Sequence, residues 1–443
     1  MHESSRELAG GCGSPVHLNR RSLLRMAGLS GLCWLTPLAT QLARSAERSR
    51  VSARSLIMLW LEGAPSQLET FDPHPGTEIA AGSLARKTKV REIEIGFGFE
   101  QLAEQMESVS LIRAITSKEG DHERAVYNIK TGFRPDTTLL HPAIGSVICH
   151  HFNEHDSSTV DIPRHISILP GNAAARGGYL GDQYDAFKIS DPVNPVPDVE
   201  AWADRKRQLQ RLEDLKFADE HFRSQRRDDS SKARQFGQHN LESALRMMSS
   251  EQLSAFNVGD VPNADRLKYG DTPFGRGCLA AMRLVQAGAR CVEVTLPGWD
   301  THVDNHKLQA GQISILDPAI ASLIADLKER DLLDSTMIIC GGEFGRTPWV
   351  NKLGGRDHWP HGFSMAIAGG GIPGGRIVGK TSGTPKSDTN DHSTNLNESN
   401  SVENLHATIF RAFGIDSAEE LMTPVGRPMK ISEGKPIKKL LEG

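Results

Sequence analysis

The feature that most constrains the fold of this chain is a set of short, continuous apolar runs. They cover residues 55–61, 109–115, 289–296, 336–340 and 364–368. A strand with one face in water alternates apolar and polar residues, whereas a strand of a parallel sheet is buried on both faces and is apolar throughout. The runs therefore predict strands of a mostly parallel sheet that lies between layers of helices.

Amphipathic helical patterns lie between these runs. Apolar residues recur three or four positions apart in residues 274–285, 313–327 and 405–412. Each pattern places one apolar stripe against a sheet. Ser401 can cap the last helix and Gly414 can end it. Strands that alternate with helices predict an α/β fold, a doubly wound sheet with helices on both faces.

Residues 199–265 interrupt this alternation. The first part of the segment is rich in charges of both signs, which is typical of a solvated helix. A chain of 443 residues has ample length for one large α/β domain. We expect a single domain over residues 51–435, with a charged helical insertion at about 199–265.

The first residues are typical of a targeting segment. Arg20 and Arg21 precede a mostly apolar stretch over 26–43, which ends near a small-residue site at Ala46. This pattern predicts a twin-arginine (Tat) signal peptide over residues 1–46, with export to the periplasm or beyond. An amphipathic helix or a membrane anchor is the alternative. No later apolar stretch reaches the roughly 20 residues of a membrane span, so we expect no transmembrane anchor in the mature chain.

Charge and cysteine usage exclude two classes of partner and scaffold. The net charge is -4, and no stripe of Lys and Arg interleaved with aromatics occurs, so we expect no nucleic-acid partner. Outside the leader the cysteines are Cys149, Cys278, Cys291 and Cys340, without Cys-x-x-Cys spacing. This usage indicates neither a disulfide framework nor a zinc ribbon.

Acidic and imidazole side chains follow the later apolar runs. Asp300 and His302 come after the third run, Glu343 after the fourth, and Asp357 and His358 shortly beyond. Loops at the carboxyl ends of parallel strands converge on one crevice, so these side chains can meet there. Together they predict a site for a divalent metal. Zinc or manganese suits two carboxylates and two imidazoles, and calcium or magnesium is possible with more oxygen ligands.

The mature chain resembles a known exported family through five ordered motifs. They occupy residues 63–73, 130–135, 299–302, 342–348 and 356–359. The family is catalogued as domain of unknown function 1501 and is grouped with the alkaline phosphatase and sulfatase superfamily. The resemblance implies an alkaline phosphatase-like fold, with metal ligands at Asp300 and His302, at Glu343, and at His358 with Asp357.

The superfamily also implies a ligand after the first strand. Its members commonly place Asp-Gly there, where this chain has Glu62-Gly63, whereas the acid that recurs in the family itself falls at Glu69. We expect Glu69 to be the ligand, with Glu62 as the alternative. Ser66, in the same loop, is a candidate hydroxyl for binding an anion, although a Pro-Ser turn beside acids is also an ordinary turn.

The nucleophile of sulfatases is missing from its expected place. Sulfatases carry Cys or Ser about nine residues before a Thr-Gly, and the equivalent position before Thr131 is His122. Neither Cys nor Ser occurs in residues 120–131, which excludes the formylglycine mechanism. His122 can be a nucleophile or proton donor, a metal ligand, or simply structural, and metal-activated water is a further route to hydrolysis.

Two arginines allow opposite interpretations of the same acids. Arg346 could hold a sulfate or phosphate in a bidentate fork. Alternatively, Arg346 lies three residues from Glu343, and Arg356 adjoins Asp357, so structural ion pairs could use these groups.

The sequence thus predicts an exported metal-dependent hydrolase that acts on sulfate, phosphate or related anionic esters, of small molecules or glycans. The alternative is a non-catalytic metal- or anion-binding protein on the same scaffold.

Overall fold

The structure is a computed structural model that describes residues 52–442 apart from 154–159, 172–174, 198, 200–203, 226–240, 242 and 388–390. The predicted signal peptide, residues 1–46, lies outside the described residues. Residues Val51–Gly443 form one compact unit.

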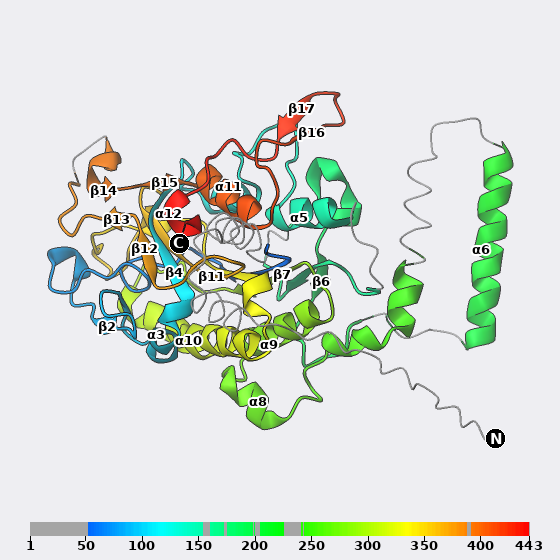
Figure 1. The fold of residues 1–443 in the computed structure, drawn as a ribbon, viewed down its shortest axis with the longest axis horizontal. Helices are drawn as coiled ribbons and strands as arrows, with labels where there is room; N and C mark the ends of the chain where they lie inside the picture. The colour runs from blue at the N-terminus through cyan, green and yellow to red at the C-terminus, as the bar shows by residue number, and fades with distance from the viewer. Residues whose placement is uncertain are drawn as a thin grey trace, which may run out of the picture. The chain divides into compact units, whose positions relative to one another are not determined.

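A nine-stranded sheet forms the centre of this unit (Figure 1). Its order is β12-β4-β11-β8-β1-β7-β5-β6, and β15 pairs with β4. The strands are β1 (Ser55–Leu61), β4 (Val109–Thr116), β5 (His165–Ile168), β6 (Phe187–Ile189), β7 (Cys291–Leu296), β8 (Thr336–Gly341), β11 (Phe363–Gly369), β12 (Arg376–Val378) and β15 (Asn400–Ser401). The five predicted runs are β1, β4, β7, β8 and β11.

The sheet is mostly parallel, as predicted. Only β11 runs against its neighbours, β4 and β8, among the described strands of this sheet. Because β11 is antiparallel to both, β4 and β8 point the same way. The carboxyl ends of β1, β4, β7 and β8 therefore lie at one edge.

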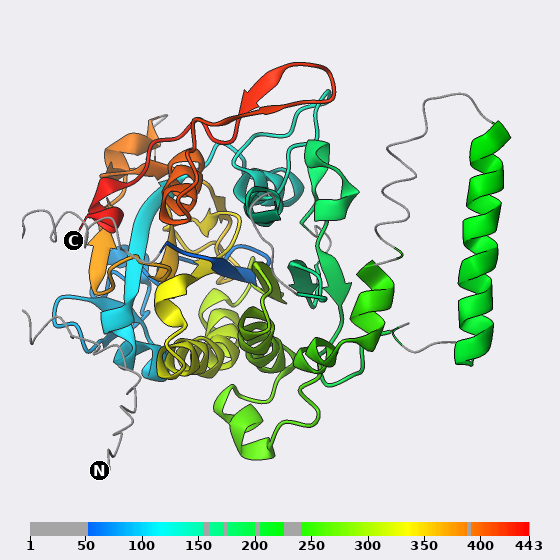
Figure 2. The same cartoon turned by 45° about the vertical axis from the view of Figure 1, so that its right-hand side comes forward.

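Helices cover both faces of the sheet, which confirms the doubly wound fold (Figure 2). One face packs against α9 (Pro273–Gln286) and α10 (Asn305–Glu329), and the other against α4 (His122–Thr131), α5 (Ile144–Asn153) and α11 (Val402–Ala412). Successive residues of β1 alternate between the two cores: Ile57 belongs to the first and Met58 to the second. A strand buried on both sides must be apolar throughout, which explains the continuous runs.

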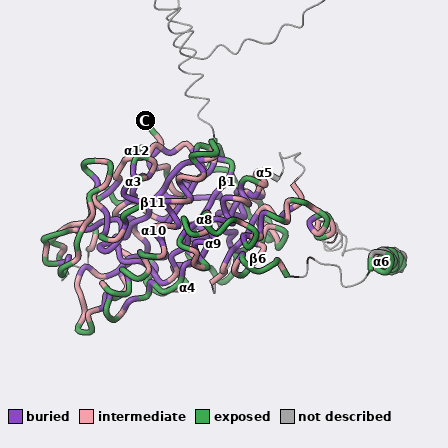
Figure 3. Tube along the Cα trace, turned by 90° about the horizontal axis from the view of Figure 1, so that it is seen from below, coloured by how far each residue is buried: buried purple, intermediate pink, exposed green. Residues whose placement is uncertain are grey.

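The charged segment forms α6 (Arg205–Gln225), whose described side chains are mostly exposed (Figure 3). The shorter helices are α3 (Glu100–Glu104), α8 (Asn263–Lys268) and α12 (Lys438–Leu441). Small two-stranded sheets pair β2 (Ala85–Lys87) with β3 (Glu94–Gly96), β9 (Gly345–Arg346) with β10 (His358–Trp359), β13 (Lys380–Thr381) with β14 (Leu396–Asn397), and β16 (Glu420–Met422) with β17 (Pro428–Lys430).

Among the described helices, α10 alone is long and apolar enough to cross a membrane by length and composition. Half of its most apolar window is buried in the protein, and its residues Leu316, Ile320 and Leu323 belong to the core beneath the sheet. A core helix passes the same test of length and composition as a membrane span.

Candidate metal centre

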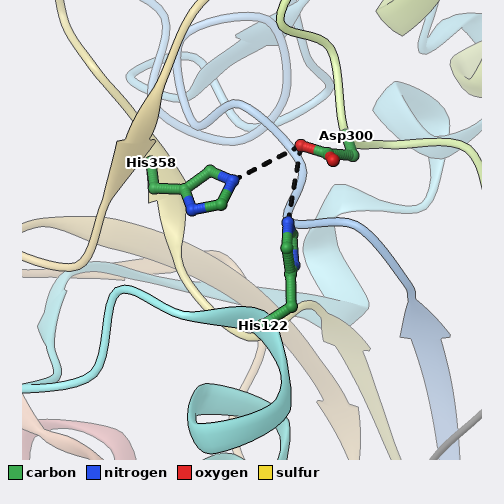
Figure 4. Close-up of side chains that lie close together, drawn as sticks. All are labelled: His122, Asp300 and His358. Carbon is green, nitrogen blue, oxygen red and sulfur yellow. Dashed lines mark ion pairs between the residues drawn. The ribbon is translucent and has the colours of Figure 1, made fainter.

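His122, Asp300 and His358 meet at the carboxyl edge of the sheet (Figure 4). His122 is the first residue of α4, Asp300 follows β7, and His358 opens β10. The Nε2 atoms of both imidazoles lie 3.5 Å from Asp300 Oδ1. One ligand atom from each of the three residues falls within 4.8 Å of the others, which is a spacing that allows them to hold a metal ion.

His302 adds a third imidazole to this group. Its Nε2 lies 3.1 Å from Asp300 Oδ1 and 3.0 Å from His358 Nε2. Three imidazole nitrogens therefore face one carboxylate oxygen. Of the metal ligands expected from the sequence, Asp300, His302 and His358 are brought together here, and His122 joins them.

The opposite nitrogen of each ring is held by an acceptor. His122 Nδ1 lies 2.7 Å from Glu343 Oε1, and His302 Nδ1 lies 2.8 Å from Asp357 Oδ1. His358 Nδ1 lies 2.8 Å from the carbonyl oxygen of Gly120. Proteins orient metal-binding imidazoles in this way, with Nδ1–H donated to a carboxylate or carbonyl and the Nε2 lone pair directed at the metal.

Two features of this arrangement would suit a bound cation. With their Nδ1 atoms donating, His302 and His358 direct Nε2 lone pairs at each other across 3.0 Å. Among the described residues, His122 Nε2 and Glu343 Oε2 are also buried without a hydrogen-bond partner. Three nitrogens with one carboxylate oxygen are a donor set that zinc or manganese would suit.

Glu343 and Asp357, expected as ligands, contact imidazoles in the structure. Glu343 is 1% exposed, and its Oε1 also accepts a hydrogen bond from the Gly63 amide at 3.1 Å. Asp357 additionally accepts a hydrogen bond from Asn351 Nδ2 at 3.2 Å. These contacts give both carboxylates an orienting role. Glu343 Oε2 is buried and has no hydrogen-bond partner among the described residues.

The pKa values of His122, His358 and Asp300 are shifted in different directions by their surroundings. The hydrogen bond to Glu343 raises the pKa of His122 above its usual value. Partial burial, with Arg346 nearby, lowers the pKa of His358. Burial opposes ionisation of Asp300, but Arg346 outweighs it and lowers the pKa of this carboxyl. Asp300 is therefore an anion, and His358 a neutral ligand, at neutral pH.

Arg346, expected as an anion-binding fork, donates hydrogen bonds within the protein. Its side chain is fully buried, Nε donates to the carbonyl of Ala64 at 2.9 Å, and Nη1 donates to that of Arg356 at 3.2 Å. Nη2 donates to the Gly63 carbonyl and to Asp300 Oδ1, the latter at 2.6 Å. These contacts occupy the guanidinium in the structure, and the role of Arg346 in binding an anion stays a prediction.

Glu69 lies in an ion-pair network with Arg356 and His306, and its assignment as the first-strand ligand stays a prediction. Its Oε1 lies 3.1 Å from Arg356 Nη2 and 2.9 Å from His306 Nδ1. Burial opposes its ionisation, but His306 and Arg356 lower its pKa to about 2. Ser66 is buried beside Glu69, and its role as an anion-binding hydroxyl stays a prediction. The carboxyl of Glu62, the alternative ligand, lies against Gly171.

The first strand instead contributes backbone atoms. The Gly63 amide binds Glu343, and its carbonyl binds Arg346. Gly63 has φ +106°, and a Cβ atom here would lie 2.6 Å from the Asp300 amide nitrogen. The close approach of the two loops requires glycine. The role of Gly63 was missed, although the Glu62-Gly63 pair at a strand end was a signal for it.

Phe344 forms an apolar wall of the centre. Its ring centroid is 5.0 Å from that of His122 and 4.6 Å from that of His358. The Phe344 ring thus packs against two of the imidazoles of the centre. Gly120, whose carbonyl orients His358, was also missed, because the sequence carries no signal for a single backbone acceptor.

No curated protein matches this chain. Among solved structures, it is similar to the PsFucS1 sulfatase from Pseudoalteromonas sp., with 9% identity, 87% of this chain and 72% of that chain covered, and TM-score 0.37. The alkaline phosphatase of the Antarctic bacterium TAB5 has 12% identity, 82% and 99% coverage, and TM-score 0.35. The zinc complex of the C-terminal periplasmic domain of EcEptC from Escherichia coli has 10% identity, 88% and 91% coverage, and TM-score 0.36.

A family comparison gives a match over nearly all of the described chain. Residues 53–441 match the family described as "Protein of unknown function (DUF1501)". The five motifs that suggested this relationship all fall within the matched residues. The chain therefore belongs to the DUF1501 family.

Proposed function

We propose that this protein is an exported, metal-dependent hydrolase of sulfate, phosphate or related anionic esters of small molecules or glycans. One observation carries the proposal: three imidazole Nε2 atoms, each with its opposite nitrogen anchored, face the Asp300 carboxylate. A divalent ion bound there would lower the pKa of a coordinated water and would neutralise charge on the ester oxygens.

The residues around the centre have distinct parts in this proposal. Asp300, His122, His302 and His358 would hold the ion. Glu343 and Asp357 keep the Nδ1 protons of their imidazoles in place, and Phe344 limits the space on one side. With neither Ser nor Cys in residues 120–131, water is the nucleophile that this arrangement supports. His122 is then a ligand, because its free nitrogen faces Asp300.

Export is the part of the proposal that depends on the sequence alone. Arg20 and Arg21 precede the apolar stretch that defines a Tat signal. The test is to express the full chain with both arginines changed to lysine and to fractionate the cells. We expect the wild-type chain outside the cytoplasm and the variant inside it, whereas equal distribution of the two would contradict the Tat route.

A non-catalytic binding protein is the second candidate. Arg346 is paired with Asp300 at 2.6 Å, so the site already has one built-in countercharge for its carboxylate. Such a site could hold a metal or an anion without turning over a substrate.

A substrate screen separates these two candidates. Protein loaded with Zn²⁺ or Mn²⁺ is assayed against aryl sulfates, aryl phosphates and phosphodiesters, with Asp300→Ala as the test variant and Asp265→Asn, an exposed acid on α8, as the control. We expect turnover that Asp300→Ala abolishes and Asp265→Asn preserves. If the loaded protein turns over none of these esters, the binding protein is the better account.

A further inference from the structure

The contacts of Arg346 bear on how many metal ions the centre can hold. This guanidinium is fully buried, and its contact to Asp300 is made at Oδ1, the same oxygen that the imidazoles face. Its Nη1 also lies 3.5 Å from His302 Nε2. A fixed positive charge therefore already stands beside the ligand atoms.

The net charge of the centre matches the charge of one divalent ion. Three carboxylates contact the imidazoles or face them, namely Asp300, Glu343 and Asp357, and the Arg346 guanidinium pairs with Asp300. With neutral imidazoles the group carries two net negative charges, which one divalent ion neutralises. A second divalent ion would leave an excess of two positive charges in a partly buried site, which is unfavourable.

The donor atoms lead to the same number. Three Nε2 atoms and Asp300 make four protein ligands, which complete the coordination of a single zinc ion. His122, Asp300 and His358 have the spacing of a metal site, and His302 Nε2 lies 3.1 Å from Asp300 Oδ1 and 3.0 Å from His358 Nε2, so the four donors share one location.

We propose that this centre takes one divalent ion per chain, and that Arg346 is the permanent second cation that sets this number. The guanidinium orients Asp300 through Oδ1 and offsets part of its charge. This inference rests on the proposed metal centre, but it does not depend on hydrolysis.

Several hydrogen bonds hold Arg346 in place, as a fixed cation beside the metal site requires. Four of its contacts are to the Gly63, Ala64 and Arg356 carbonyls and to Asp300, so three loops fix its position. Arg346→Lys keeps the charge but loses the fork, whereas Arg346→Gln loses both. The two variants disturb packing similarly and differ in charge, so comparing them isolates the electrostatic effect.

The experiment measures binding of Zn²⁺ and, separately, Mn²⁺ to the metal-stripped full chain by calorimetry, with metal content after gel filtration. We expect one ion per wild-type chain and one per Arg346→Lys chain. Removal of the charge that contacts Asp300 at 2.6 Å should make Arg346→Gln bind the first ion at least about tenfold more tightly than Arg346→Lys. Circular dichroism establishes that each variant is folded.

Each other outcome contradicts one stated claim: the number of ions, the role of Arg346, the metal centre or the hydrolase. Two ions per wild-type chain contradict the inference and leave the hydrolase proposal standing. One ion with equal affinity in both folded variants removes the role of Arg346. If the variants do not fold, the wild-type stoichiometry still decides the number. Absence of binding refutes the metal centre itself, and one ion without ester turnover refutes only the hydrolase.

Discussion

At the scale of single residues, Gly63 joins three parts of the centre through its backbone. Its amide binds Glu343, its carbonyl binds Arg346, and its Cα faces the Asp300 backbone. Because a side chain here would meet that backbone at 2.6 Å, the positions of Asp300 and Glu343 depend on the absence of a Cβ.

Gly63→Ala should therefore lower the free energy of unfolding and weaken metal binding together. The matched control is Gly82→Ala, since Gly82 has φ +94° but nothing within 4 Å of its Cβ position. Both substitutions carry the cost of a left-handed backbone, roughly 1–2 kcal/mol, and the clash adds about 2 kcal/mol at Gly63. Urea unfolding and Zn²⁺ titration of both variants measure the difference. Equal effects at the two glycines would mean that the loops can separate without cost.

Asp357 allows a test of orientation without removal of a ligand. Asp357→Asn keeps the shape of the side chain but replaces the acceptor that holds His302 Nδ1 at 2.8 Å. Loss of such a partner should weaken zinc binding about 10- to 100-fold. Asp265→Asn, on exposed α8, is the control and should leave the affinity unchanged. A complete loss of binding would instead indicate that Asp357 is itself a ligand.

At the scale of elements, the centre depends on how α4 is fixed to β7, since these elements carry His122 and lead to Asp300. A buried ion pair joins them: Lys130 Nζ lies 2.9 Å from Glu293 Oε1, and the side chains are 7% and 3% exposed. The Lys130 ammonium also lies 5.0 Å from the centre of the Trp60 ring of β1. The pair thus links α4 to β7, and the Lys130 side chain also contacts β1.

Breaking this pair should be costly. Lys130→Met leaves the Glu293 carboxylate buried without its cation, which should lower the free energy of unfolding by about 3–5 kcal/mol. Lys268→Met, which breaks an exposed pair with Asp265, is the control and should have little effect. Adding Glu293→Leu to Lys130→Met should recover part of the loss in urea unfolding. No recovery would show that Lys130 acts by packing and not by charge.

The elements also show how far the sequence could predict this fold. The runs that became β1, β7 and β8 were predictable because burial on both faces demands continuous apolarity. The direction of β11 was not predictable, because a continuous apolar run has the same pattern in a parallel and in an antiparallel strand. The short edge strands β6 and β12 carry too few residues for a pattern.

The centre was predictable to the extent that strand ends determine it. Asp300 and His358 follow from their positions after apolar runs. The burial of Arg346 against the Gly63 carbonyl, a contact 283 positions apart in the chain, depends on the approach of two loops in space. For the same reason the pairing of Glu69 with Arg356 could not be distinguished from metal binding in the sequence.

At the scale of the whole molecule, stability should fall in mild acid through His406 of α11. This imidazole is buried, its Nε2 lies 2.7 Å from the Ile129 carbonyl, and burial lowers its pKa to about 4 from 6.5. The unfolded chain takes up the proton first, so stability is fully present above pH 6.5 and is lost as the pH falls towards 4. The loss should reach about 3 kcal/mol.

Urea unfolding at pH 7 and pH 4.5 measures this loss. His406→Gln keeps a donor for the Ile129 carbonyl but cannot titrate, so its unfolding free energy should change less between the two pH values than that of the wild-type chain. An identical change in both proteins would assign the acid sensitivity to other groups, such as Asp72, whose pKa is lowered by His74 and Arg113 against the effect of burial.

The central claim is that His122, Asp300, His302 and His358 form a divalent metal centre on this fold, and thermal and urea unfolding of the metal-stripped chain test it most directly. With free Zn²⁺ about 100-fold above its dissociation constant, the free energy of unfolding should rise by about 2.7 kcal/mol, and His358→Ala should lose most of this gain. If neither Zn²⁺ nor Mn²⁺ stabilises the wild-type chain, and His358→Ala behaves like the wild type, the centre does not bind metal.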